Sequence, residues 1–127
     1  MGTFRARIAV ASLTNPDHRR ELPGVVVDAG SAYNWIPSGV LLELGVEPVR
    51  IERFETADGR ILEREVGFAF VFAGGRSAAT TVVFAGEGDM VFLGAIGLEG
   101  LNLRIDLSRK ELIPAGPLPA AAIAAAA

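Results

Sequence analysis

Hydrophobic and polar residues alternate along several short stretches of the chain, which is the pattern of half-buried β-strands. In the stretch from Thr3 to Leu13 apolar side chains recur at every second position through Phe4, Ala6, Ile8 and Val10. The turn-forming run Asn15-Pro16-Asp17 follows, and it predicts a reversal of the chain. Val25-Val26-Val27 is β-branched throughout and lies between glycines. We therefore predict a short strand, buried on both faces, that delivers Asp28 to a strand end.

The centre of the chain predicts a long β-hairpin. Two strand-like stretches, Val49 to Thr56 and Ile61 to Phe72, are joined across Asp58-Gly59, and Asp-Gly between such stretches is the strongest short-range hairpin signal. Gly74-Gly75 predicts a second turn. Further strands are predicted at residues 79–84, 90–93, 103–107 and 111–113.

Two short helices interrupt the strands in this prediction. Ser38 is placed to cap the first helix, and Gly45 to end it. Ile96, Leu98 and Leu101 have the spacing of one helical face and indicate the second. Many short strands separated by turn signals predict an all-β domain, barrel-like in shape, with one or two short helices.

The composition fits one folded domain, because a chain of 127 residues that is 50% hydrophobic can bury a core. We expect this domain at residues 1–114 and assign residues 115–127, rich in alanine and proline, to a tail. The net charge is −3 and the arginines are scattered, so no nucleic-acid partner is expected. No apolar stretch is long enough for a signal sequence or a membrane span, so we expect a cytoplasmic protein without membrane contacts.

Few residues could carry chemistry. The chain has no cysteine, which excludes thiolate catalysis, disulfides and cysteine-based zinc sites. The single histidine, His18, lies in a polar, turn-rich stretch and is predicted to be a solvated loop residue. A Ser-His-Asp mechanism could be built only around this histidine. Carboxylate chemistry is the main option that remains.

One carboxylate stands out through its context. Asp28-Ala29-Gly30 matches the Asp-x-Gly pattern of aspartic-protease active sites, and it is followed by Ser31 and by Asn34-Trp35-Ile36-Pro37. Further landmarks come in order: Thr56-Ala57-Asp58-Gly59, Val91-Phe92-Leu93-Gly94, Leu98-Glu99-Gly100-Leu101, Arg104-Ile105-Asp106-Leu107 and Leu112-Ile113-Pro114. Together they resemble the retropepsin-like aspartic proteases, and among these the bacterial and archaeal single-domain members.

This resemblance implies a retropepsin-like barrel with a flap hairpin, and an endopeptidase that needs no cofactor and no metal. Asp28 is the implied catalytic residue, and the other implied site residues are Ala29, Gly30 and Ser31 in the active-site loop, Ala57, Asp58 and Gly59 in a substrate-binding flap, and Phe92, Leu93 and Gly94 in a second apolar-glycine segment. Hydrolysis requires two carboxyls, and the chain carries one such aspartate. A homodimer would supply the second by symmetry, and an extended peptide or protein substrate would bind as an added strand.

The chain departs from the family pattern at three alanines. Ala29 stands where the family usually has Thr or Ser, whose hydroxyl links the two active-site loops across the dimer axis. Ala32 and Ala95 stand where retroviral members carry an acid and an arginine. A dimeric peptide-binding module with weak or no catalysis is therefore the alternative. Two residues of these motifs also have simpler explanations: Asp58 as a turn former and Trp35 as a core or groove-wall aromatic.

Overall fold

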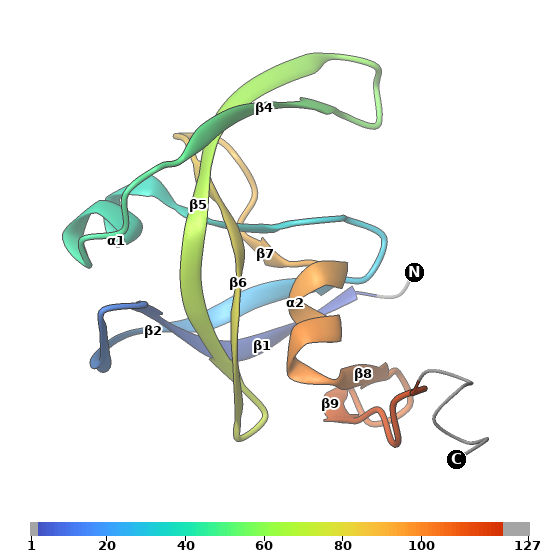
Figure 1. Ribbon diagram of the computed structural model, residues 1–127. Coiled ribbons are helices and arrows are strands. Elements are labelled where there is room, and N and C mark those ends of the chain that lie inside the picture. The colour runs from blue at the N-terminus through green and yellow to red at the C-terminus, as the bar shows by residue number, and fades with distance from the viewer. Residues whose placement is uncertain (1–2, 121–127) are drawn as a thin grey trace.

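The computed structural model describes residues 3–120, which are mostly β-structure with two short helices (Figure 1). The strands are β1 (Thr3–Ser12), β2 (Asn15–Asp28), β3 (Asn34–Pro37), β4 (Arg50–Glu55), β5 (Ile61–Ala73), β6 (Arg76–Ala85), β7 (Phe92–Leu93), β8 (Leu103–Asp106) and β9 (Glu111–Pro114). The helices are α1 (Ser38–Glu43) and α2 (Ala95–Leu101). The predicted all-β class is confirmed. The predicted tail lies outside the described residues from residue 121 onward.

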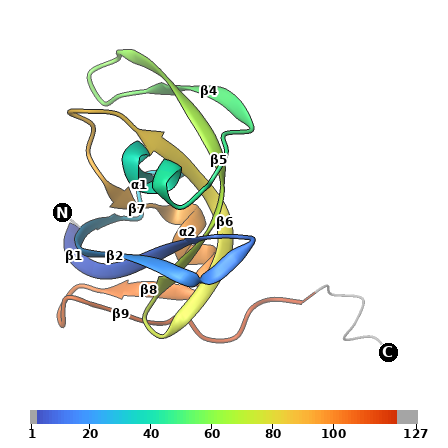
Figure 2. The same ribbon diagram turned by 90° about the vertical axis from the view of Figure 1, so that its left-hand side faces the viewer.

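Seven of the described strands form one mixed sheet in the order β1-β2-β7-β3-β6-β5-β4. β1 also pairs with β5, through Ala9, Val10 and Ala11, so six strands close into a ring and β4 remains outside it as an edge. The β4–β5 hairpin projects from this ring, as Figures 1 and 2 both show. β8 and β9 form a separate two-stranded sheet.

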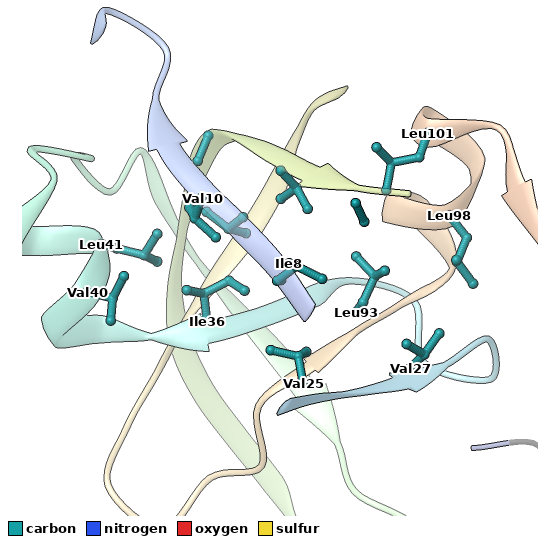
Figure 3. Packing of buried hydrophobic residues seen from close by; sticks show 14 of the residues in the cluster. Ile8, Val10, Val25, Val27, Ile36, Val40, Leu41, Leu93, Leu98 and Leu101 are labelled. Atoms are coloured by element: carbon teal, nitrogen blue, oxygen red, sulfur yellow. The ribbon is translucent and has the colours of Figure 1, made fainter. Parts of the chain in front are cut away.

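Apolar side chains from the whole ring fill its interior (Figure 3). Ile8, Val10, Val25 and Val27 point inward from β1 and β2 and are 3% exposed or less. Val26, between two of them, is only partly buried, so the prediction that this strand is buried on both faces is wrong. The helices add Val40, Leu41, Leu98 and Leu101 to the same core.

The turn predicted at Asn15-Pro16-Asp17 is wrong. β2 begins at Asn15, and the chain reverses at Leu13-Thr14 instead. Asn15, Arg20, Glu21 and Leu22 pair with β1, and β7 reaches β2 only at Val26 and Val27. Pro16 and Pro23 lie where the β1–β2 register shifts, and such bulges tolerate prolines. His18 consequently lies exposed on a strand rather than in a loop.

The other elements agree closely with the sequence-based expectation. The three hairpins β4–β5, β5–β6 and β8–β9 and both helices are confirmed. Ser38 is the first residue of α1 and makes no capping bond, since Pro37 occupies the N-cap position. β7 is shorter than predicted, because only Phe92 and Leu93 pair with neighbouring strands. Within residues 3–120, neither helix is long and apolar enough to cross a membrane.

Candidate active site

Asp28 is the last residue of β2, and its side chain is half-buried. The amide of Gly30 donates to its Oδ1 at 2.9 Å, and the hydroxyl of Ser31 donates to its Oδ2 at 3.1 Å. The amide of Ser31 also donates to the Asp28 carbonyl at 3.2 Å and closes the turn. Ala29 and Gly30 are exposed. The predicted active-site loop therefore holds one carboxylate in a defined orientation.

The second apolar-glycine segment lies directly beside this loop. Leu93 is fully buried and pairs with Val27 in the parallel β2–β7 ladder. A Cβ at Gly94 would come within 2.3 Å of the Tyr33 carbonyl oxygen and 2.6 Å of the Ser31 carbonyl oxygen. Only glycine leaves room for this approach of two backbones. The two predicted motifs, which are far apart in the sequence, thus lie side by side in the structure.

Main-chain hydrogen bonds also join the active-site loop to the first turn of α2. The amide of Ala95 donates to the carbonyl of Ser31 at 2.7 Å, and the amide of Ile96 donates to the carbonyl of Ala32 at 3.0 Å. Ala32 and Ala95, the two positions at which this chain lacks the charged residues of retroviral members, lie in this contact. Backbone hydrogen bonds therefore connect these two segments.

Asn34, which belongs to a motif quoted above but not to the predicted site residues, connects three elements. Asn34 is fully buried; its Oδ1 accepts from the Gly94 amide at 2.9 Å, and its Nδ2 donates to the Thr81 carbonyl at 3.0 Å and to the Thr80 hydroxyl at 3.3 Å. A Cβ at Gly97 would come within 2.3 Å of its Oδ1. The signal for this role in the sequence is a polar residue at the start of the otherwise apolar β3.

A cavity of about 570 Å³ lies between the active-site loop and the projecting hairpin. Residues 30–33 line it on one side, residues 54–57, 60 and 62 on the hairpin side, and residues 88–90 complete the wall with Trp35 and Phe92. It brings together Gly30, Ser31, Ala57 and Phe92 from the predicted site. The other predicted site residues do not line it: Asp28, Ala29, Asp58, Gly59, Leu93 and Gly94.

Aromatic rings form the apolar wall of this cavity. The ring of Trp35 lies 5.1 Å from that of Phe54 in an edge-to-face arrangement and 5.8 Å from that of Phe92 in a stacked one. Tyr33 contacts Phe54 edge to face at 5.8 Å. Trp35 is therefore both a buried residue and a wall of the cavity, which confirms its prediction as a core or groove-wall aromatic. Such a wall favours apolar side chains.

The tip of the hairpin is held by its own side chains. The hydroxyl of Thr56 donates to Asp58, and Nε of Arg60 donates to Oδ2 of Asp58 at 3.1 Å. The Thr56 bond and then the Arg60 bond lower the pKa of Asp58 below its ordinary value. Gly59 follows with φ of +88°. These contacts account for Asp58 as a turn former, exposed at the position expected for a flap tip.

Possible metal ligands and similarity to known proteins were also considered for this site. Across residues 3–120, no three acidic, histidine or cysteine side chains gather in a way that could hold a metal ion. Comparison with models of protein families and with curated proteins found no match for the chain. The geometry of the site and the sequence motifs are therefore the indications of function.

Proposed function

We propose that this chain is one subunit of a homodimeric, retropepsin-like aspartic endopeptidase in which each Asp28 supplies one of two catalytic carboxyls. The observation that carries the proposal is the orientation of the Asp28 carboxylate by hydrogen bonds from Gly30 and Ser31. These two residues also line the cavity beneath the hairpin. The closed sheet and the adjacency of Leu93-Gly94 to the active-site loop add support. The retropepsin-like barrel is part of this proposal.

Two carboxyls held together in a dimer suit peptide hydrolysis. At about 3 Å, two carboxylates repel each other by roughly 5 kcal/mol at an effective dielectric near 20, so the pair retains one shared proton. The ionised carboxylate takes a proton from a water that attacks the peptide carbonyl carbon, and the protonated carboxyl gives its proton to the carbonyl oxygen.

The alternative is a dimeric peptide-binding module that keeps the fold but turns over slowly or not at all. Ala29 favours it, because a methyl group cannot form the cross-axis hydrogen bonds that a Thr or Ser hydroxyl makes. Both candidates require the dimer and the covered cavity. They differ only in whether a bound peptide is cleaved.

The proposal is tested by incubating the purified protein with a peptide library and identifying products by mass spectrometry. Asp28→Asn keeps the shape of the side chain and is expected to lower turnover by at least about a hundredfold, since it removes the general acid and base. Asp17→Asn, at an exposed position of β2, is the control and should match the wild type. Equal turnover in Asp28→Asn would exclude this site, and binding without cleavage by the wild type would favour the peptide-binding module.

Sedimentation tests the assembly independently. Because each chain carries one candidate catalytic carboxyl, activity per chain should fall when the dimer dissociates on dilution. A fully active monomer contradicts the shared site.

A further inference from the structure

An ion pair joins the projecting hairpin to the loop that faces it across the cavity. Arg64 on β5 donates from Nε to Oδ2 of Asp89 at 2.7 Å and from Nη2 to Oδ1 at 2.9 Å. The side chains are 26% and 10% exposed, which makes this the least exposed ion pair among residues 3–120. A two-bonded Arg–carboxylate pair fixes direction as well as distance.

Asp89 also organises its own loop. Its Oδ2 accepts from the Gly86 amide at 2.7 Å, and its own amide donates to the Gly86 carbonyl at 3.0 Å. Gly88 turns the chain with φ of +86°. Met90 follows, 63% exposed, and lines the cavity together with Gly88 and Asp89. In Figures 1 and 2 the connection between β6 and β7 reaches toward the hairpin. Arg64 thus holds one wall of the cavity against the hairpin.

Further charges continue this contact across the base of the hairpin. Arg64 lies directly opposite Glu52 of β4 in the ladder. Glu52 accepts from Nε of Arg50 at 2.6 Å, and Nη2 of Arg50 reaches the Tyr33 hydroxyl at 3.5 Å. Charges of alternating sign therefore run from Arg50 through Glu52 and Arg64 to Asp89. The base of the hairpin is tied to the body at both ends, whereas the bonds at its tip are internal.

We propose that Arg64 and Asp89 are positioning residues for the cleft. Their pairing sets the separation between the hairpin and residues 86–90, so that Met90 and the aromatic wall form a preshaped subsite for a bulky apolar side chain of an extended peptide. This inference rests on the proposed function for the identity of the cleft. A preshaped subsite avoids the cost of ordering a loop on binding. Neither residue hydrogen-bonds to the Asp28 carboxylate, so their loss should affect peptide binding more than the chemical step.

The test compares Asp89→Asn with Glu21→Gln. Both changes remove one carboxylate from an ion pair, but the Arg7–Glu21 pair is exposed and remote from the cleft. Three quantities are measured: amide hydrogen exchange of residues 86–91 in the free protein, the Kd for a statine-containing peptide with a phenylalanine side chain, and KM and kcat for a cleaved peptide. In Asp89→Asn we expect faster loop exchange, a Kd and KM raised by about tenfold and kcat within about twofold, consistent with the loss of one charged hydrogen-bonded pair. Glu21→Gln should match the wild type in all three.

A double variant adds a second criterion. If the two side chains act as a unit, Arg64→Gln with Asp89→Asn should bind the statine peptide no more weakly than Asp89→Asn alone.

The contrary outcomes are distinct. Unchanged loop exchange in Asp89→Asn, or faster exchange with unchanged Kd and KM, overturns the positioning role while leaving the proposed function in place. A wild-type protein that neither binds the statine peptide nor cleaves any peptide overturns the proposed function and the cleft role with it.

Discussion

The side-chain oxygen of Asn34 accepts a hydrogen bond from the amide of Gly94, 60 positions away in the chain and 2.9 Å away in space. Both residues are buried. Asn34 begins β3 directly after the active-site loop, and Gly94 ends the second apolar segment. Because a buried amide left without a partner costs about 1–3 kcal/mol, this bond fixes the two motifs beside each other.

Replacing Asn34 with alanine should therefore destabilise the protein strongly. The change leaves the Gly94 amide and the Thr81 carbonyl without their side-chain partner. We expect a loss of about 3 kcal/mol in the free energy of unfolding, measured by urea denaturation. Asn15→Ala, at an exposed position, is the control and should change stability by less than about 0.5 kcal/mol. A loss below about 1 kcal/mol in Asn34→Ala would show that the buried network carries little stability.

Two glycine substitutions should act in opposite directions. In Gly94→Ala the new methyl group meets the carbonyl oxygens of Tyr33 and Ser31 at 2.3 and 2.6 Å, so the backbones must separate and stability should fall by about 3 kcal/mol or more. In Gly39→Ala nothing lies within 4 Å of the methyl group, and the residue belongs to α1. Helix propensity should then stabilise the protein by up to about 1 kcal/mol. Thermal unfolding of both variants measures these changes in stability. Equal effects would contradict the close approach at Gly94.

The pairing of Asp89 should make stability depend on pH in the acid range. The Arg64 guanidinium, and to a smaller extent the Gly86 amide, lower the pKa of Asp89 below its ordinary value despite the opposing effect of burial. A carboxyl with a lowered pKa in the folded state stabilises the protein above its ordinary pKa, and this contribution disappears as the pH falls through the lowered value.

Wild type and Asp89→Asn should therefore differ by about 2 kcal/mol in unfolding free energy at about pH 6. The difference should shrink steadily below about pH 4. Glu52, which faces Arg64 from β4, is present in both proteins. Chemical denaturation across this range provides the measurement, and a constant difference would contradict the assigned ion pair.

Ala29→Thr should strengthen the proposed dimer. Ala29 is exposed, so a larger side chain meets no obstacle within the subunit, and a hydroxyl on each chain would restore two cross-axis hydrogen bonds. At about 1 kcal/mol each, these lower the dimer dissociation constant by about 30-fold. Ala79→Thr adds the same groups at an exposed position of β6 and should leave the constant unchanged. Sedimentation over a range of concentrations gives the constants, and activity should rise most at low concentration. Identical constants for Ala29→Thr and wild type would remove much of the support for Asp28 as half of a pair.

The sequence by itself determined the elements whose signals are local. The alternation between Phe4 and Leu13, the Asp58-Gly59 loop and the Gly74-Gly75 turn predicted β1 and the β4–β5 and β5–β6 hairpins. Strand period and turn chemistry depend only on near neighbours in the chain. The motif around Asp28 could be identified for the same reason, because it occupies a few consecutive residues.

Tertiary structure decided the features that depend on which segments become neighbours. β2 continues through Pro16 and Pro23 because the β1–β2 register shifts at both places, and no local signal reveals where a register shifts. The Arg64–Asp89 pair forms because β5 and the loop before β7 meet across the cavity. The Asn34–Gly94 bond has the same kind of origin. The type of each residue fixes its charge and hydrogen-bonding capacity. Its partner depends on the order of the strands, and the burial of the whole core sets that order.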